Sequence, residues 1–196
     1  MLDIAIVSIT TAVLSAEIWD PTTNQFKFLR RMTTPRTYHS VALLLKDGRV
    51  LAGGGGLCGE NCAANHPDVE ILVPPYLLDT DGNMVTDRPQ IVASPSTVAH
   101  GESITIELDT SEAHTFALMR LGAATHSVNN DSRRIPLTTT STQSLSTGHG
   151  LFTFIVPSNP SIALPGTYFL FAMNAGGVPS VGATISISST SANVFE

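Results

Sequence analysis

The sequence predicts an all-β protein, and three observations support this fold class. The chain has 196 residues, of which 42% are hydrophobic and only 13% are charged, with 15 Gly and 12 Pro. Short apolar runs rich in Val, Ile, Thr and Phe recur along it, separated by Gly, Pro, Asn and Ser. No stretch has a convincing helical period. This combination is typical of turn-rich β-sheet proteins.

The first half of the chain predicts propeller-like β-structure. Two segments have similar sequences, AEIWDP at 16–21 and VEILVP at 69–74, and they lie about 50 residues apart. This distance is typical of the repeat length of propeller blades. Between them, HSVALLL, the turn KDGR and VLAGGGG predict a hairpin, because Asp47-Gly48 is flanked by apolar runs. We expect a strand that starts at His39 and has His39 and Val41 on the same face. Both faces of this strand are apolar in sequence, as in an inner strand.

The second half predicts a β-sandwich of immunoglobulin size. Alternating runs recur at SITIEL (103–108), TFALMRL (115–121), LFTFIV (151–156), TYFLFAM (167–173) and ATISIS (183–188). Several short strands with turn residues between them are typical of that fold. The composition changes near Arg88-Pro89, so we expect a blade-like part at 16–88 and a sandwich at 89–196.

The net charge and the N-terminal sequence argue against nucleic-acid and membrane partners. The formal net charge is −6, and the basic pairs Arg30-Arg31 and Arg133-Arg134 form no larger cluster, so we expect no nucleic-acid partner. The N-terminal run is apolar through Leu14, but no Lys or Arg precedes it, and Asp3 stands where a signal peptide carries positive charge. The run is also shorter than the roughly 20 residues that span a bilayer. We therefore expect neither a clear signal peptide nor a membrane partner.

Tyr38 and His39 stand side by side where the first apolar strand begins. One interpretation is an interface tyrosine beside a hydrogen-bonded histidine. The chemical interpretation is a pair of metal ligands. Because neighbours on a regular strand point to opposite faces, both side chains can reach one ion only where the backbone is irregular.

Three further features have both structural and chemical interpretations. The run Gly53–Gly56 lacks the GK[ST] and the helix of a phosphate-binding loop, so it predicts close backbone packing. Cys58, Cys62 and His66 are spaced like half of a zinc site, which leaves open a zinc-stabilised β domain, or a short-loop disulfide if the protein is secreted. His126 lies in the polar stretch GAATHSVNNDSRRIPL, which also suits an exposed hairpin.

Taken together, four motifs resemble the C-terminal part of a galactose oxidase-like copper radical oxidase. They are RTYHSVALLLKDGRVLAGGGGLCG, NHPDVEILVPPYL, ATHSVNNDSRRIPL and LPGTYFLFAMNAGGVPSVGATI. The resemblance runs from Ala16 to Ile187 in the family's order and leaves residues 1–15 unmatched. It implies a partial kelch β-propeller of one to two blades at 16–88, followed by an immunoglobulin-like early set domain at 89–196.

The resemblance also implies roles for individual residues. Tyr38 matches the family's axial tyrosine, which binds copper and acts as general base. His39 and His126 match its two histidine ligands, and Cys58 and Cys62 match a short-loop disulfide. The resemblance further implies a secreted monomer.

The implied chemistry is oxidation of a primary alcohol, of a galactose-like sugar or another molecule, to an aldehyde, with O2 reduced to H2O2. Cu(II) suits two imidazoles, oxygen ligands and an open position. The family's second redox group, a cross-linked Tyr-Cys radical cofactor, has no match in this chain. We therefore expect a C-terminal fragment that is inactive alone. The alternative is a non-catalytic carbohydrate- or protein-binding β module.

Overall fold

The computed structural model describes residues 12–56, 65–126 and 128–188. Contacts within the chain divide it into two units. The first unit comprises Met1–Leu44, Arg49–Pro74 and Ala124–Asn129, and the second comprises Leu45–Gly48, Pro75–Ala123 and Asn130–Glu196. The described residues form strands and one short 3-10 helix, η2 (Pro75–Leu77), with no α-helix among them. The all-β prediction is therefore confirmed.

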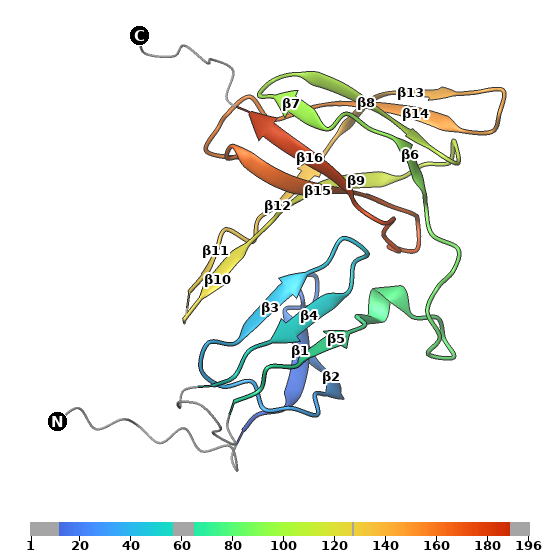
Figure 1. Cartoon of the computed structure of the whole chain (residues 1–196). Helices are drawn as coiled ribbons and strands as arrows, with labels where there is room; N and C mark the ends of the chain where they lie inside the picture. Colours follow the sequence, from blue (N-terminus) through green and yellow to red (C-terminus); the bar gives the residue numbers. More distant parts are fainter. Residues whose placement is uncertain (1–11, 57–64, 127, 189–196) are drawn as a thin grey trace, which may run out of the picture. The chain divides into compact units, whose positions relative to one another are not determined.

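In the first unit, the strands before residue 75 form two small antiparallel sheets (Figure 1). Strands β1 (Ser15–Asp20) and β2 (Gln25–Arg31) form a hairpin in which Trp19 pairs with Phe26. Strands β3 (Val41–Leu44), β4 (Val50–Gly53) and β5 (Val69–Leu72) form the second sheet in sequence order.

The hairpin predicted around Asp47-Gly48 is present, with Leu44 paired to Val50 and Gly48 at φ 86°. One detail of the prediction is wrong. Strand β3 starts at Val41, so His39 lies outside it. On the face that Ala42 and Leu44 share, Ala42 is exposed and Leu44 is half-buried.

The second unit is a sandwich of two sheets (Figure 1). One sheet has the order β12-β9-β15-β16-β7 and the other β13-β14-β8-β6. The strands are β6 (Ile91–Ala93), β7 (Thr97–Ala99), β8 (Ser103–Leu108), β9 (Thr115–Arg120), β12 (Arg134–Leu137), β13 (Thr139–Ser144), β14 (Gly150–Ile155), β15 (Gly166–Met173) and β16 (Ala183–Ser188). Only the β16–β7 pair is parallel among the described pairings.

The five strands predicted for the sandwich agree with β8, β9, β14, β15 and β16 to within one residue at each end. Strand β8 shows why, since its burial alternates and Ile104, Ile106 and Leu108 face the core. Strand β13 was not predicted because its sequence TTSTQS is polar and mostly exposed. It is held by its pairing with β14 rather than by an apolar face of its own.

The hydrophobic core lies in the sandwich. Its largest fully buried side chains are Tyr168, Phe116, Phe152 and Phe154. By contrast, Ala52 is the only buried hydrophobic residue among the described part of the first unit. No helix in the described residues is long and apolar enough to cross a bilayer.

A short hairpin leaves the sandwich between β9 and β12. Its strands are β10 (Ala123–Thr125) and β11 (Val128–Asn130), and its tip contains His126. At its base, the Asp131 carboxylate accepts hydrogen bonds from Arg120 Nη1 and from Arg133 Nε, the latter at 2.6 Å. Asp131 has a left-handed backbone at φ 66°. The Arg120–Asp131 pair joins the chain segments before and after the hairpin, and Arg133 holds Asp131 from the same side.

Candidate metal centre

Tyr38 and His39 form a turn immediately before strand β3. His39 has φ 59°, a left-handed conformation that is uncommon for residues other than glycine. This irregular backbone brings the two rings to the same side, with their centroids 3.9 Å apart and their planes tilted by 37°. The irregular backbone that such a pair of ligands requires is therefore present.

The third ring of the candidate site belongs to His126. Its backbone is also left-handed, at φ 55°, and it belongs by its contacts to the first unit. Its ring centroid lies 4.9 Å from that of His39 and 5.9 Å from that of Tyr38. The two histidine Nε2 atoms are 3.3 Å apart, although 87 residues separate them in sequence. The three residues proposed from sequence as metal ligands therefore converge.

A hydrogen bond orients the His126 ring. Its Nδ1 lies 2.8 Å from the Thr125 hydroxyl oxygen. When Nδ1 carries the ring hydrogen, it donates to Thr125 and leaves a lone pair on Nε2, which is the nitrogen that faces His39. Such a partner on the other ring nitrogen is a common feature of metal-binding histidines.

The donor set fits a divalent transition metal. Nitrogen ligands lie about 2.0–2.1 Å from such an ion, so two of them on opposite sides are about 4 Å apart. The observed 3.3 Å therefore suits adjacent positions around one ion. Two imidazoles and a phenol oxygen match the ligands that Cu(II) prefers. In the described residues no three His, Cys, Asp or Glu converge on a possible metal, and Tyr38 is the third residue of the present group.

The glycine run provides the close packing expected from the sequence. Gly54 and Gly55 have φ of 80° and 110°. A Cβ on Gly54 would lie 2.2 Å from the carbonyl oxygen of His39, and one on Gly55 would lie 3.0 Å from that of Pro35. The Gly56 amide donates to the Tyr38 carbonyl at 3.1 Å. The turn that carries Tyr38 and His39 thus rests directly on glycine backbone.

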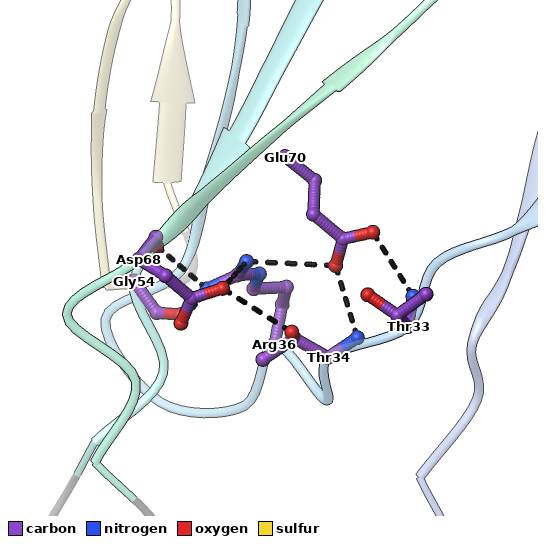
Figure 2. Close-up of polar contacts among 6 residues, drawn as sticks. All are labelled: Thr33, Thr34, Arg36, Gly54, Asp68 and Glu70. Atoms are coloured by element: carbon purple, nitrogen blue, oxygen red, sulfur yellow. Dashed lines mark hydrogen bonds and ion pairs between the residues drawn. The ribbon is translucent and has the colours of Figure 1, made fainter.

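A buried arginine lies two residues before Tyr38. The Arg36 side chain is 4% exposed and pairs with Asp68 at 2.8 Å and with Glu70 at 3.5 Å (Figure 2). The Arg36 guanidinium lowers the pKa of Asp68 by hydrogen bonding. The pKa of Glu70 is also lowered, chiefly because its carboxylate accepts the Thr33 amide hydrogen. We call Arg36, Asp68 and Glu70 the arginine clamp.

Sequence reasoning did not single out the arginine clamp. A signal was present, because Asp68, directly before β5, and Glu70 within it are two residues apart and so lie on the same side of this otherwise apolar segment. Two acidic groups on one face of a short strand suggest a cationic partner. Which of the ten Lys and Arg residues of the chain supplies it depends on the tertiary structure.

A pocket of about 610 Å³ lies beside Tyr38 and His39. It is lined by Tyr38, His39, Gly55, Gly56, Asn65, His66 and Pro67. The His66 Nε2 atom is buried and has no hydrogen-bond partner among the described residues. Cys58 and Cys62, and with them the disulfide and zinc hypotheses, lie outside the described residues.

Comparison with known proteins identifies relatives. Residues 88–187 match the family model described as galactose oxidase-like, early set domain. A galactose oxidase from Gibberella zeae is 46% identical over 179 residues, which are 91% of this chain and 25% of that protein. An aldehyde oxidase from Arabidopsis thaliana is 31% identical over 85% of this chain and 28% of that protein.

A solved structure agrees with these relatives. It is a fungal alcohol oxidase of the AA5 family in complex with copper, with a TM-score of 0.81 and 43% identity over 90% of this chain and 36% of that one. The chain spans about a quarter of the length of the curated relatives it matches. Because the family model covers more than half of the chain, the chain belongs to the galactose oxidase-like family through its early set domain.

Proposed function

We propose that this chain is the C-terminal portion of a copper radical oxidase and that Tyr38, His39 and His126 hold its Cu(II). One observation carries the proposal: residues 87 apart in sequence bring two Nε2 atoms to 3.3 Å, with the Tyr38 ring beside them. A purely structural role does not explain two histidines with left-handed backbone facing each other at the surface.

The domain assignment is part of the proposal. Residues 16–88 are a remnant of a kelch propeller, of one to two blades, and residues 89–196 are the early set domain. The three-stranded antiparallel sheet β3-β4-β5 supports the first assignment, and the family match at 88–187 supports the second. We further propose a Cys58–Cys62 disulfide, secretion, and a monomeric state.

The proposed reaction converts a primary alcohol and O2 into an aldehyde and H2O2. The alcohol loses two electrons and two protons, and dioxygen gains both pairs. Copper, when bound, supplies a Lewis-acidic position for the alcohol and accepts one of the electrons. Tyr38 as the phenolate takes the hydroxyl proton as general base. His39 and His126 hold the reacting centre in place.

We place the second electron acceptor outside the described residues of this chain. Its other tyrosines have structural roles, since Tyr168 is fully buried and donates to the Leu164 carbonyl at 2.7 Å, and Tyr76 donates to the Gly48 carbonyl at 2.7 Å. We therefore propose that the 196-residue chain binds copper but does not turn over alcohol. Peroxide production by the purified chain with copper and a primary alcohol would contradict this part.

Copper titration followed by electron paramagnetic resonance tests the site. We expect one Cu(II) per chain with nitrogen coupling, lost in His39→Ala and in His126→Ala. His114→Ala is the matched control, because His114 is a half-buried histidine of the second unit whose Nδ1 lies 2.7 Å from the Glu112 carbonyl and whose ring contacts Phe152. Copper binding that is absent, or that neither site variant changes, rejects the proposal.

A second candidate function is a carbohydrate- or protein-binding module. Cross-strand pairing places Trp19, Phe26 and Phe28 on one face of the β1–β2 hairpin, and they are 49%, 67% and 78% exposed. Exposed apolar patches of this kind mark interaction sites. Binding to an oligosaccharide array that Trp19→Ala abolishes, together with absent copper binding, would favour this candidate.

A further inference from the structure

The arginine clamp connects three separate parts of the first unit. Arg36 Nη1 donates to the Gly54 carbonyl at 3.1 Å and to the Asp68 carbonyl at 2.9 Å. Its Nη2 donates to Asp68 Oδ2 at 2.8 Å and to Glu70 Oε1 at 3.5 Å (Figure 2). The guanidinium thereby joins the loop before Tyr38, the glycine run after β4, and strand β5.

The carboxylates of the clamp also hold the start of this loop. Glu70 Oε2 accepts the Thr33 amide hydrogen and Oε1 that of Thr34, both at 2.9 Å (Figure 2). The Thr34 hydroxyl donates to Asp68 Oδ2 at 3.2 Å. The chain from residue 33 to the metal-facing turn is therefore fixed by charged groups at its beginning and middle, and by Gly56 at its end.

This fixation matters because the turn has an unfavourable conformation. The left-handed region is disfavoured for a residue other than glycine, and His39 adopts it with φ 59°. Ordering the loop residues costs backbone entropy as well. Strained backbone persists only where surrounding contacts determine it. Here the surrounding contacts are those of the glycine run and of the arginine clamp.

We propose that Arg36 is a positioning residue for the metal centre, which holds the Tyr38–His39 turn in its metal-facing conformation through Gly54, Asp68 and Glu70. Arg36 acts through the loop and touches neither histidine ring in the contacts described. The inference rests on the proposed function for its consequence on copper. Its local part, the fixing of the turn, is independent of any metal.

Arginine is required by this geometry. Its planar fork places Nη1 on two carbonyl oxygens while Nη2 reaches two carboxylates, and a lysine ammonium cannot reproduce this pattern from one position. Arg36→Lys therefore keeps the charge and removes the fork, whereas Arg36→Met removes both. Comparing the two separates geometry from charge.

Amide hydrogen exchange of the metal-free protein is the first readout. In Arg36→Met we expect the Thr33, Thr34 and Gly56 amides to exchange at least about tenfold faster than in the wild type. Protection in β9 and β15 of the sandwich should be unchanged. Arg36→Lys should give a smaller change at the same amides. Arg88→Lys is the matched control, since Arg88 donates to the carbonyls of residues 47, 179 and 180 and belongs to the second unit.

Copper affinity and the resonance spectrum are the second readout. We expect both Arg36 variants to bind Cu(II) about 10–100-fold more weakly than the wild type, as is typical when a ligand loses its supporting partner, and with altered nitrogen coupling. Arg88→Lys should match the wild type in both respects.

The two readouts separate the failure of each proposal. If the wild type binds copper and the Arg36 variants match it in exchange and affinity, the positioning role is wrong and the copper site stands. If the wild type does not bind copper, the proposed function is wrong, and the exchange of the Gly56 amide alone decides whether Arg36 fixes the turn. Uniform loss of protection across both units would show a general structural role and would overturn the inference.

Discussion

Gly54→Ala should disrupt the candidate site while leaving the sandwich intact. The substitution adds one methyl group directly beneath the turn that carries Tyr38 and His39. Its Cβ would lie 2.2 Å from the His39 carbonyl oxygen and 2.9 Å from Ser40 Cα. Both neighbours are backbone atoms, so no side-chain rotation can relieve the contact.

The expected cost has two parts. Alanine at φ 80° costs about 1–2 kcal/mol, because an L-residue is disfavoured in the left-handed region. The forced contact adds about 1–3 kcal/mol, the usual range for overpacking. To restore a separation of 3.0 Å, the His39 carbonyl must move by about 0.8 Å. Such a displacement moves the imidazole as well, and we expect at least a roughly tenfold loss of copper affinity.

Gly82→Ala is the matched control for backbone strain. Gly82 has φ 82°, and nothing lies within 4 Å of the added Cβ. It therefore shares the conformational cost and lacks the contact. We expect a loss of about 1–2 kcal/mol in its own unit and unchanged copper binding.

Denaturant unfolding and copper titration measure the two effects. Trp19 is the only tryptophan of the chain and lies in β1, so its fluorescence reports on the first unit. Circular dichroism reports on both units. If Gly54→Ala destabilises the protein no more than Gly82→Ala and binds copper normally, the close packing of the glycine run does not hold the turn, and the reasoning is refuted.

Three further predictions concern stability. Asp131→Asn should lower the free energy of unfolding of the sandwich by about 1.5–3 kcal/mol, because both arginine partners lose a charged acceptor; calorimetry with no shift would contradict this. Leu170→Ala should lower the free energy of unfolding by about 2–5 kcal/mol, because Leu170 is fully buried in the core. The control Ile155→Ala should lower it by about 0.5 kcal/mol or less, because Ile155 is 54% exposed. Equal losses in denaturant unfolding would refute the assigned core. Because its folded-state pKa is lowered from the usual 4.5, Glu70 should protect the Thr33 amide fully at pH 4.5 and above. This protection should be lost only as the pH falls further, through the lowered pKa of the folded state. Glu70→Gln should remove this acid dependence, and an unchanged profile would contradict the role of the carboxylate.

Much of the sandwich could be predicted from sequence because its strands alternate. In β8 and β14, every second residue is apolar and buried, so local pattern and tertiary burial agree. Strand β13 could not be predicted, because its six residues are polar and its existence depends on pairing with β14. The start of β3 was misplaced because periodicity does not reveal a left-handed residue such as His39.

For the candidate site, the available chemistry could be predicted from the residue types, whereas the geometry depends on the three-dimensional fold. Tyr38, His39 and His126 were identified as candidates from their motifs, and the glycine run predicted close backbone packing. Whether the three rings meet depends on two left-handed histidines and on contacts between residues 87 apart, which no local pattern encodes. The arginine clamp was likewise decided in three dimensions. Its charges lie 32 and 34 residues apart in the chain and become partners only when β5 pairs with β4.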